Sequence, residues 1–113
     1  MDKFKSVDKF KSVTQLVKHI LEVDERARNS DDYLYCMVAT CYALNNGIDI
    51  TKTTMIRFFS MRNEWDIPGF ETVRRSRQKI QQHFPELRAK EEVENNRQLR
   101  ELQFEEYARG SVV

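Results

Sequence analysis

The sequence predicts an all-α protein that folds as a single compact domain of about five helices. Its 113 residues are the length of one ordinary domain. The composition is 40% hydrophobic and 33% charged, which is too apolar for a disordered chain. Only 3 glycines and 2 prolines are present, too few for a sheet with many tight turns, and apolar residues recur at helical spacing.

The N-terminus carries a perfect tandem repeat, in which residues 2–7 are followed by the same six residues at 8–13. Two copies of so short a unit do not form a repeat architecture. We expect residues 1–8 to be disordered, residues 9–88 to form the helical core, and residues 89–113 to form an acidic C-terminal helix and tail.

Capping and breaking residues delimit the expected helices. Ser12 and Gln15 have the spacing of a capping box, and Thr51 suits the start of the third helix. The second helix is apolar nearly all round, as is typical of the centre of a bundle. Pro85 ends the fourth. The expected ranges are 13–28, 31–45, 52–62, 70–83 and 90–108.

Side chains at helical spacing predict the core. The first helix contributes Val13, Leu16, Val17, Ile20 and Leu21, and the fourth contributes Phe70, Val73, Ile80 and Phe84. The third contributes Met55, Ile56 and Phe59, with Phe58 or Met61 packing secondarily. Among the aromatic residues, Trp65 is the one most expected outside the core, because it falls in a predicted turn. Cys36 and Cys41 point to separate faces of one helix, so we expect two buried small side chains and no disulfide between them.

Charge is unevenly placed along the chain. Residues 1–50 hold seven basic and eight acidic side chains, net −1. Residues 51–90 hold nine basic and four acidic, net +5, and residues 91–113 hold three basic and six acidic, net −3. A basic segment between neutral and acidic flanks indicates a surface for an anionic partner.

The predicted nucleic-acid site is the fourth helix, within a segment 51–84 that resembles a helix-turn-helix. Long polar and basic side chains of this kind read base edges or hold phosphates in the major groove. A basic exposed helical face is also common in proteins that do not bind nucleic acid, so a solvated face and a surface for a protein partner are the alternatives. Arg77 shares the inward face and is expected to be partly buried along its stem. The site residues expected to contact DNA are Arg74, Arg75, Arg77, Gln78, Lys79, Gln81 and Gln82. Backbone contacts are expected from Lys52, Arg57, Arg62 and Arg88. Pro85 and the charged run after it leave no room for a wing.

A resemblance points in the same direction. Residues 65–81, with 84–87, are similar to a segment of small, uncharacterised phage and prophage proteins of Gram-positive bacteria. Residues 12–18 and 105–110 resemble the same proteins. The resemblance covers most of residues 12–110, and it implies a phage origin and a helix-turn-helix-like core rather than a defined activity.

The inventory of reactive residues predicts a protein that is not an enzyme and holds no metal or cofactor. His19 and His83 are isolated on separate helices, and no zinc-ligand spacing or glycine-rich phosphate loop occurs. Asp31 and Asp32 suit a helix N-terminus better than acid–base chemistry. No apolar run reaches the roughly 20 residues of a membrane span, and the charged N-terminus lacks a secretory signal, so we expect a cytoplasmic protein.

Two functions fit these observations. The first is a phage DNA-binding protein, either a small regulator or an accessory factor, that binds double-stranded DNA through the fourth helix. The alternative is a phage protein that inhibits a host protein or defence complex, for example as an anti-CRISPR-type inhibitor, with the acidic last helix at its interface. A solvated helix held by pairs such as Glu94–Gln98 and Arg97–Glu101 is the interpretation that we favour for the acidic residues themselves. A homodimer through the acidic helix or the apolar second helix is compatible with both functions.

Overall fold

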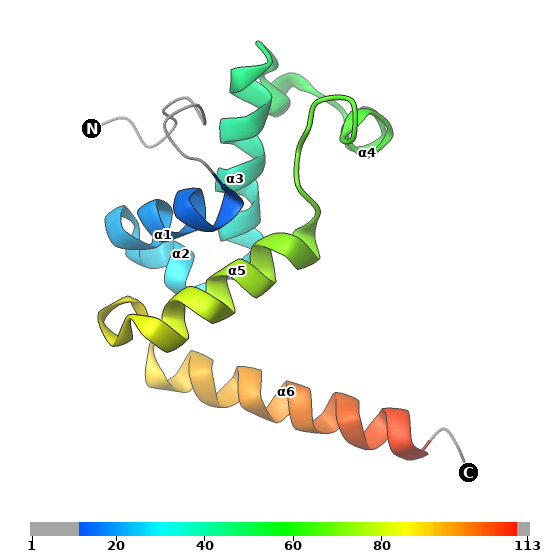
Figure 1. Cartoon of the computed structure of the whole chain (residues 1–113). Helices are drawn as coiled ribbons and strands as arrows, with labels where there is room; N and C mark the ends of the chain where they lie inside the picture. Colours follow the sequence, from blue (N-terminus) through cyan, green and yellow to red (C-terminus); the bar gives the residue numbers. More distant parts are fainter. Residues whose placement is uncertain (1–11, 111–113) are drawn as a thin grey trace.

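The computed structural model describes residues 12–110, and these are helical with no strand among them (Figure 1). The predicted all-α class is therefore confirmed, whereas the doubled N-terminal segment lies outside the described residues. The helices are α1 (Val13–Val23), α2 (Glu25–Asn29), α3 (Asp31–Asn45), α4 (Met55–Met61), α5 (Phe70–His83) and α6 (Glu91–Gly110). Short 3-10 turns lie at Ile50–Lys52 and Pro85–Leu87. None of the described helices is long and apolar enough to cross a membrane.

The chain breaks at Asp24, so the single helix predicted over 13–28 is wrong. Ser12 caps α1 as predicted, its hydroxyl accepting the Gln15 N–H at 3.2 Å. Asp24 then adopts an extended backbone (φ −137°, ψ 101°), and its carboxylate accepts the Arg26 N–H at 3.1 Å. The Tyr33 hydroxyl donates to the other carboxylate oxygen at 2.6 Å. This almost fully buried aspartate ends α1 and caps α2.

Replacing Asp24 by alanine is expected to lower the free energy of unfolding by about 1.5 kcal/mol, because α2 loses its cap and the Tyr33 hydroxyl loses its acceptor. Urea denaturation followed by circular dichroism measures this. The neighbouring Glu25→Ala variant is the control and should stay within about 0.5 kcal/mol of wild type. Equal stability of the two variants would contradict the assigned role of Asp24.

Helix α3 lies at the centre and has the bounds that the sequence predicts. Ser30 caps it by accepting the Tyr33 N–H at 3.1 Å, and Gly47 after its end has a φ of 74°, which glycine adopts without strain. The main core joins buried residues of α1, α3 and α5: Leu16, Val17, Ile20, Leu21, Leu34, Met37, Val38, Cys41, Val73 and Ile80. Cys41 is buried as predicted, but Cys36 is exposed, because α3 leaves one strip of its surface uncovered.

A second, smaller core lies at the C-terminal end of α3, and α4 packs against it in a way that the sequence did not predict. Trp65, the aromatic residue singled out as the most expected exception to core packing, is only 7% exposed and packs with Ile67 against Ala39 and Ala43. Thr54 caps α4, its hydroxyl accepting the Arg57 N–H at 3.1 Å, whereas Thr51 belongs to the preceding 3-10 turn. The helix is therefore seven residues long and starts later than predicted.

Helix α4 packs inward through the two secondary candidates, Phe58 and Met61, and not through its predicted core residues. Phe58 and Met61 pack against the Trp65 cluster, because that cluster occupies the space beside α3. Met55, Ile56 and Phe59, predicted as core residues, are 76%, 82% and 61% exposed. Phe70, also predicted as core, is 38% exposed, although its ring lies 5.5 Å from that of Tyr35.

Helix α6 begins beside α5 and its second half extends away from the rest of the molecule (Figure 1). Its bounds are close to the predicted 90–108. The pairs predicted within the helix, Glu94–Gln98 and Arg97–Glu101, are replaced by other contacts. Arg97 contacts Asp31 at 3.6 Å and Glu94 at 3.7 Å, and Glu101 accepts a hydrogen bond from Gln78 of α5 at 3.0 Å. The contacts with Asp31 and Gln78 fasten α6, as far as Glu101, to the rest of the protein.

Candidate nucleic-acid interface

Helix α5 carries the predicted DNA-contacting residues and has the predicted bounds, Phe70–His83. Its buried face packs against α1 and α3 through Val73, Ser76 and Ile80. The Ser76 hydroxyl lies 3.3 Å from that of Thr14 on α1. A rigid platform therefore supports the opposite face of the helix.

The helix-turn-helix arrangement predicted for residues 51–84 is not confirmed. A helix-turn-helix joins its two helices by three or four residues. Here residues 62–69 lie between α4 and α5, including Asp66 with a positive φ of 55°, and α4 packs on the end of α3. Figure 1 shows α4 separated from α5 by this long connection.

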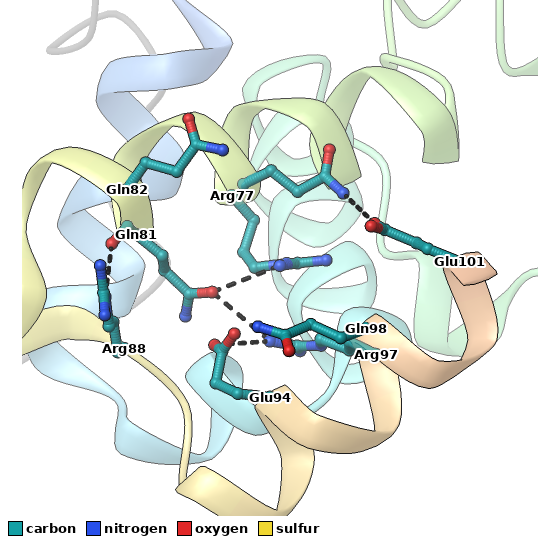
Figure 2. Close-up of a pocket in the computed structure, with 9 residues that line it drawn as sticks. Arg77, Gln81, Gln82, Arg88, Glu94, Arg97, Gln98 and Glu101 are labelled. Atoms are coloured by element: carbon teal, nitrogen blue, oxygen red, sulfur yellow. Dashed lines mark hydrogen bonds and ion pairs between the residues drawn. The ribbon is translucent and has the colours of Figure 1, made fainter.

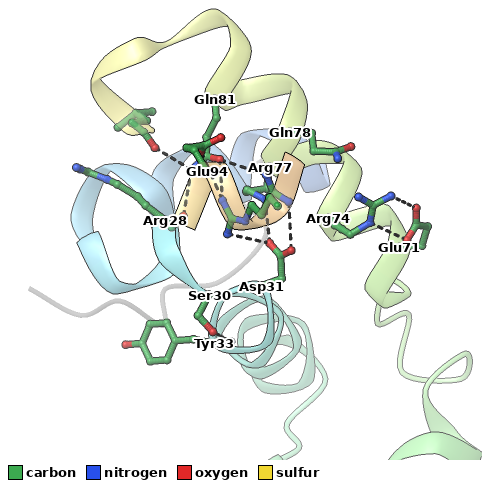
Figure 3. A network of polar contacts seen from close by, with 12 residues as sticks. Arg28, Ser30, Asp31, Tyr33, Glu71, Arg74, Arg77, Gln78, Gln81 and Glu94 are labelled. Carbon is green, nitrogen blue, oxygen red and sulfur yellow. Dashed lines mark hydrogen bonds and ion pairs between the residues drawn. The ribbon is translucent and has the colours of Figure 1, made fainter. Parts of the chain in front are cut away.

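Arg77 is a structural residue, which corrects its prediction as a DNA contact. It is 5% exposed. Its Nε donates to Oδ1 of Asp31 at 2.8 Å and its Nη2 donates to Oδ2 at 3.1 Å, as Figure 3 shows. This two-pronged pair joins α5 to the first turn of α3, so the guanidinium cannot reach a ligand outside the protein.

Gln81 is likewise buried, with 4% of its surface exposed, so its prediction as a DNA contact is also wrong. Its amide nitrogen donates to the carbonyl of Leu87 at 2.9 Å and to that of Arg28 at 3.3 Å. Its oxygen accepts from Arg77 at 3.3 Å and from Arg97 at 3.4 Å. Gln81 and Arg77 are four residues apart and share the buried side of α5, so their polar groups serve the interior.

A polar cleft of about 500 Å³ lies between α5 and α6, and Gln78 is among the residues that line it. Figure 2 shows Arg77, Arg97, Glu94 and Gln81 converging in it. Burial lowers the pKa of Arg97, and the nearby Arg77 cation adds to this effect. Since Gln78 is hydrogen-bonded to Glu101, α6 covers this side of α5 and keeps Gln78 from a free role in binding.

Arg74 and Arg75 are exposed in part but share one carboxylate, that of Glu71. The Arg74 guanidinium binds Glu71 with two hydrogen bonds, one of them from Nε at 2.9 Å. Arg75 Nε donates to the same carboxylate at 3.3 Å. These hydrogen bonds, that of Arg74 first, lower the pKa of Glu71 from 4.5 to about 2. Glu71 is therefore ionised at neutral pH and offsets part of the charge of both arginines.

The Glu71 carboxyl is expected to titrate near pH 2 in a ¹³C NMR titration, and near 4.5 in an Arg74→Gln/Arg75→Gln variant. Because the folded-state pKa is lowered, the pairing contributes stability that is present above about pH 4.5 and is lost as the pH falls through about 2. A Glu71 pKa that is the same in both proteins would contradict the pairing.

Apart from Phe70 and Glu71 in the first turn, which are also exposed, the residues of α5 that remain open to solvent form one strip, the outer ridge. It consists of Thr72, Arg75, Lys79, Gln82 and His83, which are exposed and follow helical spacing. The Arg75 side chain is 75% exposed, and no described residue pairs with the ammonium group of Lys79. Three predicted contacts, Arg75, Lys79 and Gln82, thus lie together, while Thr72 and His83 join them without having been predicted as contacts.

The residues predicted to contact the DNA backbone do not join the outer ridge. Lys52 lies in the Ile50–Lys52 turn, Arg57 lies on α4, and Arg62 follows α4 directly. The Arg57 guanidinium lies 6.0 Å from the centre of the Trp65 ring. Arg88 follows the Pro85–Leu87 turn and donates to the Gln81 carbonyl at 3.3 Å. The outer ridge therefore stands without these flanking cations.

No known protein family matches this chain, and no curated protein or solved structure matches it. The resemblance to phage proteins and the origin it implies stay predictions.

Proposed function

We propose that the protein binds double-stranded DNA through the outer ridge of α5, as a small phage regulator or accessory factor. One observation carries the proposal. Residues 72–83 contain no acidic side chain, and the exposed members are hydroxyl, amide, imidazole or cationic groups. The opposite side of the helix is anchored in the core, so the ridge is presented on a fixed support.

An α-helix fits the major groove of B-form DNA, where such side chains find their partners. Arg75 and Lys79, four residues apart, project from the same face and suit phosphate oxygens or guanine edges. Gln82 continues the strip and suits adenine. With two cations and one amide, we expect phosphate contacts to dominate the affinity and base contacts to add modest selectivity.

The test is fluorescence anisotropy of a labelled duplex across a salt series. We expect micromolar binding and a logarithmic affinity that falls with the logarithm of salt concentration with a slope of about −2, one unit for each phosphate neutralised. The absence of binding at low salt, or an affinity that ignores salt, would contradict the proposal. Inhibition of a host protein would then be the remaining function, and affinity capture from nuclease-treated host lysate would test it.

A further inference from the structure

Two helices expose large apolar side chains at a distance from the outer ridge. On α4 these are Met55, Ile56 and Phe59. On α6 they are Leu99, Leu102, Phe104 and Tyr107. No described residue covers them, and side chains of this size gathered in two patches mark surfaces for a protein partner.

The second half of α6 has little support within its own chain. Every residue over 98–109 is exposed, although the segment is helical throughout. Isolated helices of this length are marginal in water, because their stability comes mainly from packing. Leu99 and Leu102 lie on one side of the helix, while Phe104 and Tyr107 lie on another. A partner that binds this segment therefore supplies packing that the monomer lacks.

The two patches have complementary charge. Lys52, Arg57 and Arg62 accompany α4, and no acidic residue lies between positions 50 and 63. Over residues 98–109, its outer half, α6 carries three carboxylates, of Glu101, Glu105 and Glu106, against two cations, of Arg100 and Arg109, which leaves a net charge of −1. When opposite charges surround two apolar patches, they attract the two partners and fix how the partners are aligned.

The area available is that of a specific interface. The seven side chains are exposed by 53–82%. At on the order of 100 Å² each, the three side chains of α4 and the two on one side of α6 offer about 500 Å² per chain, and the polar residues around them bring the area toward the 800 Å² that each partner of a standard interface buries. By contrast, the apolar residues of α3 are mostly used in the core of the chain, which leaves α6 and α4 as the surfaces for association.

We propose that a second copy of this chain is the partner, with the outer half of α6 of each copy packed across α4 of the other. Each chain carries both halves of the contact, so two copies related by a two-fold axis satisfy both patches and close the assembly. The outer ridge of α5 takes no part in this contact, so the dimer and DNA binding are tested separately.

The test is analytical ultracentrifugation of the full chain and of two variants over a micromolar concentration series. Ile56→Asp removes the α4 patch and Leu102→Asp removes the α6 patch. Asn63→Asp, which adds the same charge beside α4 on an exposed polar position, is the control. We expect wild type and the control to dimerise, and each patch variant to have its dissociation constant raised by about 30-fold or more, as for loss of a hot-spot residue.

Mixing the two patch variants distinguishes this arrangement from others. In the mixture, α4 of the Leu102→Asp chain and α6 of the Ile56→Asp chain are both intact, so one complete contact forms and association should recover. Unchanged circular dichroism of the variants checks their folding. A wild-type chain that stays monomeric, or a mixture that does not associate, would overturn the proposal. Capture of a host protein by a monomeric wild-type chain would also overturn it and would assign the patches to that protein.

Discussion

Replacing Arg77 by methionine is expected to lower the free energy of unfolding by about 3 kcal/mol. Methionine fills much of the space of the arginine stem but leaves the Asp31 carboxylate without its two close hydrogen bonds. Among the ion pairs formed by residues 12–110, Asp31 then retains only the longer contact with Arg97, at 3.6 Å. Urea denaturation monitored by circular dichroism gives the difference.

Arg75→Met is the matched control, two residues earlier on the same helix. Its side chain is 75% exposed, so its loss should change stability by no more than about 0.5 kcal/mol. The double variant Arg77→Met/Asp31→Leu should recover part of the lost stability, because it removes both charges together. If Arg77→Met were as stable as Arg75→Met, the structural role of Arg77 would be contradicted.

The double variant Arg75→Ala/Lys79→Ala is expected to weaken duplex DNA binding by about 30-fold and to make the salt slope shallower by about 2. Both side chains are exposed, so the free energy of unfolding should stay close to that of wild type. The control is Lys52→Ala/Arg57→Ala, which removes the same charge from the α4 region. It should weaken binding only about twofold. An equal loss in both variants would show that net charge, rather than the outer ridge, determines the affinity.

Local signals predicted most of the helix boundaries. Ser30 before α3, Gly47 after it and Pro85 after α5 act within a few residues of themselves, so their effect can be predicted from sequence. The break at Asp24 depends on the Tyr33 hydroxyl, nine positions later, and periodicity continues across it. The inward face of α4 depends on Trp65 filling the space beside α3. Both errors arise from tertiary contacts that helical spacing does not encode.

The sequence predicted which helix carries the candidate site, but it did not predict which side chains of that helix are exposed. Composition places Arg74, Arg75 and Arg77 together in a basic run, although their surroundings differ. Spacing indicated that Arg77 shares the inward side with Val73 and Ile80. It could not indicate that Asp31, 46 residues earlier, binds the guanidinium. Long polar side chains serve buried networks and nucleic acids equally well, so only the tertiary structure separates these roles.

The central claim, that the outer ridge of α5 binds DNA, is tested most directly by the affinity of a Glu71→Gln variant for duplex DNA. Removing this carboxylate releases Arg74 and Arg75 from their shared partner, and the claim predicts binding about threefold to tenfold tighter with a steeper salt slope. Glu106→Gln, with the same change in net charge on the outer half of α6, should bind like wild type. Unchanged affinity in Glu71→Gln, or equal tightening in both variants, would contradict the claim.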